Sequence, residues 1–175
     1  MLGLVLVTHG NLAKEFVSAM QHVVGKQEQI ETVCIGPEDN MEERRGEILS
    51  KVEKVNIHKL VKVVGASAFY GAESLKEVNF DNEGVLDTLG LYAFKNCTKL
   101  ETINLPSTIK AMSEGAFDGC TKLKYNEYEG ANYIGSTAKP YMLLIKAKEG
   151  ATKCKVNKDC QVICASAFET NTSIS

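Results

Sequence analysis

A histidine stands where a predicted buried strand ends and a predicted helix begins. The apolar run at residues 4–7 stops at Thr8-His9-Gly10, and an amphipathic pattern follows. An imidazole is partly neutral near physiological pH, so it can act as a nucleophile. Gly10 would allow a partner's backbone to approach closely, and amides at the start of a helix after Asn11 could hold phosphate oxygens. The spacing alone leaves two interpretations open: a covalent acceptor, or a loop histidine without a chemical role.

The cysteines form no recognisable ligand set. Cys34 stands alone in the first third, and the other five lie in the second half: Cys97, Cys120, Cys154, Cys160 and Cys164. No CxxC pair occurs, and the Cys160-x-x-x-Cys164 pair lacks a second pair at zinc-finger spacing. Buried free thiols are favoured over a metal site or disulfides, which stay open as alternatives. We therefore expect neither a cofactor nor a metal ion.

The composition is that of an ordinary globular chain. The 175 residues are 44% apolar and 24% charged, with a formal net charge of -2. This charge offers no overall basic field to attract nucleic acid. The longest apolar run is far shorter than the roughly 20 residues of a membrane-spanning helix. Residues 1–10 lack the basic start and the cleavage site of a secretory signal, so we expect a cytoplasmic protein.

The elements around His9 predict an alternation of strands and helices. The continuous apolar run at 2–7 is typical of a strand buried on both faces of a parallel sheet, and 30–35 is a second strand. Two helices are predicted between and after them, at 11–24 and 41–55. Apolar residues recur in the first helix at helical spacing: Leu12, Phe16, Met20, Val23 and Val24. Strands alternating with helices favour right-handed crossovers and a doubly wound parallel sheet of the α/β class.

From about residue 60 the chain repeats itself. An Ala-Phe pair places Phe69, Phe94 and Phe117 at intervals of 25 and 23 residues, and a leucine follows each at the same intervals: Leu75, Leu100 and Leu123. A fourth Ala-Phe pair ends at Phe168, after an insertion at about 129–152. Repeats of this length predict a solenoid whose units bury their apolar sides by stacking. We expect the four phenylalanines and three leucines to point into the stack.

The first third resembles a known family. The segments GLVLVTHGNLAKEF and HVVGKQEQIETVCIGPEDNMEERRGEIL are similar to the mannose/sorbose family of enzyme IIA components of the bacterial phosphoenolpyruvate:sugar phosphotransferase system. The resemblance implies a cytoplasmic phosphocarrier that accepts a phosphoryl group from the carrier protein HPr and passes it to the IIB component of a sugar permease. The matching acceptor is His9, with Gly10 and Asn11 as the phosphate-binding residues.

The next segment departs from this family. Family members continue into a third strand and a loop resembling Asp-x-Phe-Gly-Gly-Ser/Thr-Pro, whose aspartate orients the active histidine. Here the segment reads KLVKVVGASAFYGAESL, without that aspartate. Residues 60–64 fall where the third strand should come, so we expect them to pair with strand 2–7. Asp39 is the only nearby acidic substitute, and phosphotransfer is expected to be slow or absent.

The rest of the chain resembles the BspA-like leucine-rich repeats. The resemblance rests on ASAFYGAESLKEVNF and LYAFKNCTKLETINLPSTIKAMSEGAFDGC, and it implies an interaction module with a protein or glycan ligand. The expected domains are 1–57 and 58–175. Three functions stay open: a phosphocarrier, a non-enzymatic binding module, and a chimera without selected activity. The residues do not decide between a natural fusion, a designed chimera and a misassembled reading frame.

Overall fold

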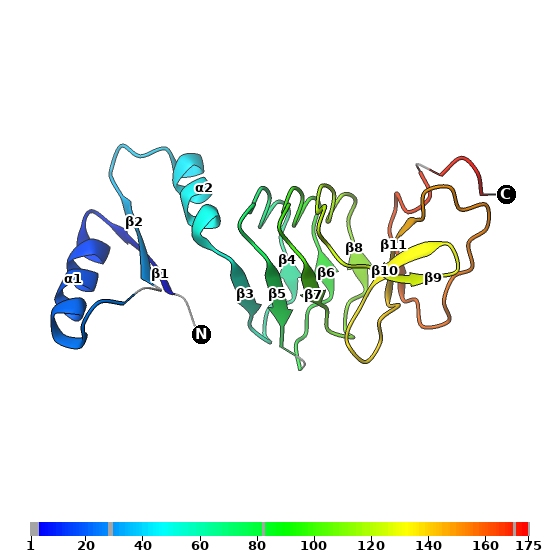
Figure 1. Cartoon of the computed structure of the whole chain (residues 1–175), viewed down its shortest axis with the longest axis horizontal. Helices are drawn as coiled ribbons and strands as arrows, with labels where there is room; N and C mark the ends of the chain where they lie inside the picture. The colour runs from blue at the N-terminus through cyan, green and yellow to red at the C-terminus, as the bar shows by residue number, and fades with distance from the viewer. Residues whose placement is uncertain (1–3, 28–29, 82, 170, 175) are drawn as a thin grey trace. The chain divides into compact units, whose positions relative to one another are not determined.

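Two units with different architectures make up the chain (Figure 1). The computed structural model describes residues 4–27, 30–81, 83–169 and 171–174, and the units are Met1–Glu53 and Lys54–Ser175. Within the described residues, both helices belong to the first unit, and strands occur in both. The fold is therefore of the mixed α/β class, as predicted. The domain boundary expected after residue 57 falls after Glu53, because the next four residues pair with a strand of the second unit.

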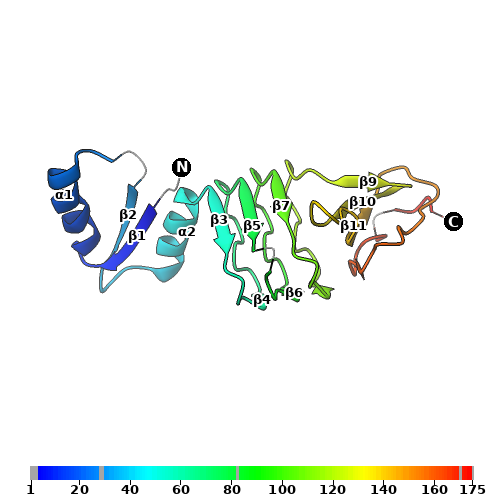
Figure 2. The ribbon, with the colours of Figure 1, turned by 90° about the horizontal axis from the view of Figure 1, so that it is seen from below.

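The first unit is a two-stranded parallel sheet with two helices. Its elements are β1 (Leu4–His9), α1 (Leu12–Val24), β2 (Ile30–Ile35) and α2 (Met41–Lys51). The register runs from Leu4 opposite Ile30 to His9 opposite Ile35, which confirms adjacent parallel strands. Residues 2 and 3 of the predicted first strand lie outside the described residues. The two helices lie on opposite sides of the sheet (Figure 2).

Helix α2 begins as predicted but ends earlier. The Asn40 side chain accepts hydrogen bonds from the backbone N–H groups of Glu42 and Glu43, at 2.9 and 3.4 Å, which is an N-cap. The expected end at residue 55 is wrong, because the backbone is already extended at Val52. Val55 belongs to the strand β3 (Lys54–Ile57), where half-buried and exposed residues alternate. A period of two and β-branched residues favour a strand over a helix here.

The core of the first unit is small. Among the residues of this unit that the structure describes, the buried apolar side chains are Ala13, Val33 and Leu49. The apolar positions that predict helix α1 are mostly exposed, and Phe16 is 57% accessible. Helix α1 packs against the sheet through Ala13, with Val17 and Met20 half-buried beside it. The sheet therefore buries only one edge of the apolar stripe.

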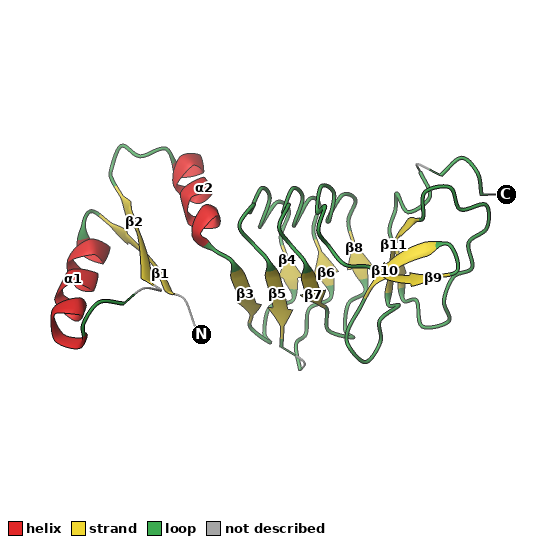
Figure 3. Cartoon of the chain, in the orientation of Figure 1, coloured by secondary structure: helices red, strands yellow, loops and turns green. Residues whose placement is uncertain are grey.

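The second unit contains two parallel three-stranded sheets (Figure 3). One sheet has the order β3-β5-β7, and the other has the order β4-β6-β8. The strands that follow β3 are β4 (Val63–Val64), β5 (Glu77–Phe80), β6 (Thr88–Leu89), β7 (Thr102–Asn104) and β8 (Ala111–Met112). The first two repeats thus contribute one strand to each sheet. The first sheet also includes β3, which precedes residue 60, and the second includes β8 of the third repeat.

The predicted pairing between residues 60–64 and the first strand is wrong. Val63 and Val64 pair in parallel with Thr88 and Leu89 of β6. Among the described residues, β1 pairs with β2 alone. The short strand β4 repeats the pattern of β6 and β8, so the repeat supplies the pairing partner for this segment.

Three phenylalanine rings stack through the repeats. The ring centroids of Phe69 and Phe94 are 5.1 Å apart, those of Phe94 and Phe117 are 5.5 Å apart, and both interplanar angles are 2°. The three repeat leucines are buried beside them: Leu75, Leu100 and Leu123. This confirms the predicted interior for Phe94, Phe117 and the three leucines, whereas Phe69 stacks on Phe94 and is half-buried. The prediction for Phe168 is wrong, since its side chain is 39% exposed.

The exposure of Phe168 follows from the fold of the last part of the chain. A four-stranded sheet has the order β12-β11-β10-β9. Its strands are β9 (Asn126–Tyr128), β10 (Ala131–Ile134), β11 (Leu143–Ala147) and β12 (Val162–Ile163). The hairpin β10–β11 occupies the predicted insertion, and β12 pairs in parallel with β11. The final repeat therefore packs beside β11. This strand contains no phenylalanine ring on which Phe168 could stack.

Candidate functional site

His9 lies at the carboxyl end of β1. Its side chain is exposed, and its partner in the register is Ile35, the last residue of β2. The Gly10 N–H donates a 2.8 Å hydrogen bond to the Ile35 carbonyl, and Gly10 has a φ of 59°, which favours glycine. The Ala13 N–H donates to Thr8 Oγ1 at 2.8 Å. These two bonds fix the turn that carries His9 into helix α1.

The imidazole of His9 has no orienting partner in the part of the chain that the structure describes. The expected substitute, Asp39, lies in the loop after β2, but its carboxylate is occupied. It accepts a 2.7 Å hydrogen bond from the Gly36 N–H and forms a 2.9 Å ion pair with Arg44 Nε. Arg44 also contacts Glu47. Asp39 thus holds its own loop and the first turn of α2.

The two predicted phosphate-binding residues differ in whether their polar groups are already hydrogen-bonded within the protein. The Gly10 N–H is already bonded to Ile35, so this amide is not free for a phosphate oxygen. Asn11 is the N-cap of α1, its side chain makes no capping hydrogen bond, and it is exposed. The positive end of the helix and the Asn11 carboxamide therefore remain available to an anion.

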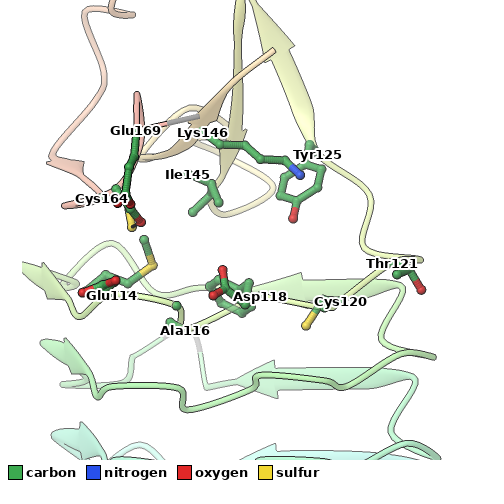
Figure 4. A pocket seen from close by; sticks show the side chains of 15 residues that line it. Glu114, Ala116, Asp118, Cys120, Thr121, Tyr125, Ile145, Lys146, Cys164 and Glu169 are labelled. Carbon is green, nitrogen blue, oxygen red and sulfur yellow. Dashed lines mark hydrogen bonds between the residues drawn. The ribbon is translucent and has the colours of Figure 1, made fainter. Parts of the chain in front are cut away.

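A cavity that the sequence did not predict lies in the second unit. It has a volume of about 350 Å³ and is lined by the turn of the third repeat, by Ile145 and Lys146 of β11, and by the final repeat (Figure 4). The carboxylates of Glu114, Asp118 and Glu169 border it. The sequence held a signal of this gap in the repeats, because Phe168 follows Phe117 by 51 residues, slightly more than two repeat intervals.

One wall of this cavity is aromatic. The ammonium group of Lys146 lies 5.3 Å from the centroid of the Tyr125 ring, within the range of a cation–π contact. Burial, followed by the nearby Cys120 and Asp118, raises the pKa of Tyr125 to about 12. Tyr125 is therefore a neutral phenol at physiological pH.

The repeat cysteines have a structural role. The thiols of Cys97 and Cys120 donate hydrogen bonds of 3.1 Å to the carbonyls of Phe69 and Phe94 in the preceding repeats. All six cysteines are free. Hydrogen bonding to Cys97 and burial raise the pKa of the Cys120 thiol. A protonated, buried thiol is a poor nucleophile and metal ligand.

Two kinds of feature are absent from the described residues. They contain no cluster of three or more His, Cys, Asp or Glu side chains placed to hold a metal ion. None of their helices has the length and apolar character needed to cross a membrane.

Family models match both parts of the sequence. Residues 48–175 match the BspA type leucine rich repeat region, in six copies. Residues 3–80 match the PTS system fructose IIA component. These two matches confirm both resemblances stated above, and they overlap at 48–80. No curated protein sequence matches the chain.

Two solved structures are similar to the chain. The T. pallidum leucine rich repeat protein TpLRR is 20% identical with a TM-score of 0.44, and the match covers 70% of this chain and 56% of that one. The pneumococcal vaccine antigen PcpA is 18% identical with a TM-score of 0.41, covering 71% and 33%. The chain thus spans about half the length of the first and a third of the second. Because the repeat model matches well over half of the sequence, the chain belongs to the BspA type leucine rich repeat family.

Proposed function

We propose that the chain joins a phosphocarrier segment to a leucine-rich-repeat interaction module, and that His9 is the phosphoryl acceptor. The observation that carries this proposal is the exposed imidazole at the carboxyl end of β1, on a turn fixed by Gly10 and Thr8. Ligands of open α/β sheets bind beyond this end of the strands. The match of residues 3–80 to the PTS system fructose IIA component supports the same assignment.

The transfer is an in-line displacement at phosphorus. The unprotonated ring nitrogen of neutral His9 attacks the phosphoryl group carried by a histidine of HPr. A new P–N bond forms as the P–N bond of the donor breaks, and the donor imidazole leaves with the bonding pair. The exposed ring and the start of α1 face the incoming phosphate, whose negative charge the helix N-terminus favours. The IIB component of a sugar permease is the next acceptor, in the cytoplasm.

The proposed transfer is slow. Among the described residues no carboxylate fixes the tautomer or the orientation of His9, since Asp39 is held by Gly36 and Arg44. A displacement of about 1 Å from the reactive geometry can cost about 10²-fold in rate. The proposal includes the finer fold assignment: a truncated doubly wound sheet in the first unit and a solenoid of stacked repeats in the second.

The test is phosphorylation of the full chain by phosphoenolpyruvate, enzyme I and HPr. Intact mass is measured under basic conditions that preserve phosphohistidine. We expect one added phosphoryl group, which His9→Ala abolishes. His22→Ala is the matched control, because His22 is an exposed histidine on α1, and this variant should be labelled like the parent. Labelling of His9→Ala would contradict the assignment, and an unlabelled but folded parent chain would favour a binding module or a chimera.

A second candidate function is supported by the outer face of one repeat sheet. Asn56, Asn79 and Asn104 lie in register across β3, β5 and β7. The Asn79 amide donates to Asn56 Oδ1 at 3.3 Å and to Glu77 Oε1 at 2.7 Å. A row of amides offers donors and acceptors that suit sugar hydroxyl groups, so we propose a glycan-binding face. An oligosaccharide array should lose its signal with Asn79→Lys and keep it with His9→Ala.

A further inference from the structure

The backbone hydrogen bonds of the repeat turns run in one direction along the stack. In the first turn, three alternate N–H groups donate to carbonyls of the second turn at 2.8 Å: Ser67 to Leu91, Phe69 to Ala93 and Gly71 to Lys95. The second turn donates to the third in the same way, at 3.3, 2.8 and 2.7 Å: Tyr92 to Glu114, Phe94 to Ala116 and Asn96 to Asp118. Each turn therefore presents three donors to the next.

The third turn presents the same donors to a cavity. The equivalent residues are Gly115, Phe117 and Gly119, and no described residue accepts a hydrogen bond from their N–H groups. All three line the cavity of about 350 Å³. Gly115 and Phe117 are buried. Buried backbone N–H groups almost always have a partner in folded proteins. Gly115 and Phe117 therefore mark a place for an acceptor, with the exposed Gly119 beside them.

The final repeat of the chain does not fill this place. The carbonyl of Ala167 is equivalent to those of Ala93 and Ala116, but it accepts from the Ala147 N–H of β11 at 2.7 Å. The Leu144 carbonyl likewise accepts from the Cys164 N–H at 2.9 Å. The hairpin β10–β11 has therefore taken the place of a repeat turn as the support for the last repeat.

The charges around the cavity define the kind of acceptor. Three carboxylates border it, those of Glu114, Asp118 and Glu169, against one lysine, Lys146. The balance of charge is negative and disfavours a phosphate or carboxylate. The carbonyl oxygens of a peptide accept from N–H groups without bringing negative charge. A lysine of a neighbouring turn already approaches this acidic border, because Lys95 Nζ lies 3.9 Å from Asp118 Oδ2. A peptide one turn further along the stack can place a basic side chain beside the same carboxylates.

We propose that this cavity binds an extended peptide segment carrying a lysine or arginine, whose alternate carbonyls accept from Gly115, Phe117 and Gly119. The peptide takes the position of a fourth repeat turn. Backbone pairing gives the affinity, as in strand addition to a sheet edge, and the carboxylates select the basic side chain. The volume lies at the lower end of ligand pockets, about 300–1,000 Å³, and suits a short segment. The site belongs to the second unit and shares no residue with the asparagine row.

The experiment uses the uniformly ¹⁵N-labelled full chain and a blocked synthetic peptide that copies residues 91–96, the second turn with its lysine. We expect the amide resonances of Phe117 and Gly119 to move downfield on titration as their N–H groups gain acceptors. The amides of Phe69 and Phe94 already donate to the next turn, so they serve as internal controls and should not move. Unchanged Phe117 and Gly119 amides at millimolar peptide would overturn the proposal.

Variants test the charge and the cavity separately. Glu169→Lys should weaken peptide binding by about two- to fivefold, the range of an exposed ion pair. Glu73→Lys is the matched control, because Glu73 is an exposed acid in the first turn and does not line the cavity. Ile145→Trp should fill the cavity and abolish binding, with the amide spectrum of the first two turns unchanged. Inorganic phosphate that shifted the same amides as strongly as the peptide would overturn the proposal, because it would show an anion site.

Discussion

The two units of the chain bury their apolar side chains in different ways. In the second unit each repeat covers its neighbour, so Phe94 and Leu100 are wholly buried between identical elements. In the first unit a two-stranded sheet covers only part of helix α1, and Leu12, Phe16 and Val23 stay exposed. A repeat becomes stable by adding copies of itself, whereas a sheet with helices on both sides needs enough strands to cover each helix. Side chains of the same type should therefore contribute very different amounts to the free energy of unfolding in the two units.

The largest expected difference lies between two phenylalanines. Phe94→Ala should lower the free energy of unfolding by about 3–5 kcal/mol, because it removes a buried ring between two others. Phe16→Ala should change it by less than about 0.5 kcal/mol, because the ring is mostly in water. Urea unfolding followed by circular dichroism measures both. Equal costs would show that Phe16 is buried in solution and that the comparison is wrong.

The buried and the half-buried thiols should react with an alkylating reagent at different rates. Cys120 is buried, and its pKa is raised by hydrogen bonding to Cys97 and by burial, whereas Cys34 in the first unit is half-buried. With iodoacetamide at pH 8, Cys34 should react at least about tenfold faster, since the thiolate is the nucleophile and a one-unit rise in pKa costs about tenfold in thiolate. Peptide mapping of the modified chain gives the two rates. Faster reaction of Cys120 would mean that the repeat stack opens before the first unit does.

The N-cap of α2 tests the first unit with a smaller effect. Asn40→Ala removes the acceptor for the Glu42 and Glu43 N–H groups and should cost about 1 kcal/mol. Amide hydrogen exchange should accelerate in α2 and stay unchanged in β5 and β7 of the second unit. Asn40→Asp, which keeps an acceptor, should exchange like the parent chain. Uniform acceleration in both units would show that they unfold together.

Tyr125 gives the smallest expected effect, at high pH. Its pKa is raised from 10.0 to about 12, so between these values the unfolded chain loses its phenol proton while the folded chain keeps it. The unfolded state then binds fewer protons, and the free energy of unfolding falls as pH rises from about 10 to about 12. Tyr125→Phe should flatten this part of the profile, and Tyr70→Phe, at a more exposed ring, should not. Identical profiles of unfolding free energy against pH for the parent chain and both variants would show that Tyr125 is exposed to solvent in the folded chain.

Local patterns in the sequence were enough to predict the elements that depend on neighbouring residues or that recur at a regular interval. The apolar run before His9 predicted β1, and the helix expected from residue 41 begins at Met41 as α2. The spacing of the Ala-Phe pairs predicted the ring stack from Phe69 to Phe117. These features depend on residues a few positions apart, or on a period that the sequence shows directly.

The features that sequence reasoning missed depend on competition between distant segments. Residues 60–64 suit a third strand of the first sheet as well as a repeat strand, and the equivalent strands β6 and β8 decided the outcome. Phe168 has the repeat phrase but follows a hairpin, so β11 rather than a repeat turn supports it. The N–H groups of Gly115, Phe117 and Gly119 lack acceptors among the described residues because no fourth repeat turn follows them in the fold. Hydrogen-bond partners that a neighbour fails to supply leave no trace in the local sequence.

The central claim is that His9 accepts phosphate without an orienting carboxylate, and a time course tests it most directly. A stoichiometric amount of purified phospho-HPr is mixed with the full chain, and samples are taken from seconds to hours for intact mass under basic conditions. We predict single labelling of the parent and of His22→Ala that develops over minutes to hours, and none of His9→Ala. Labelling complete within seconds would contradict the role assigned to the missing carboxylate. An unlabelled parent chain, with the amide spectrum of a folded first unit, would contradict the assignment of His9 as the acceptor.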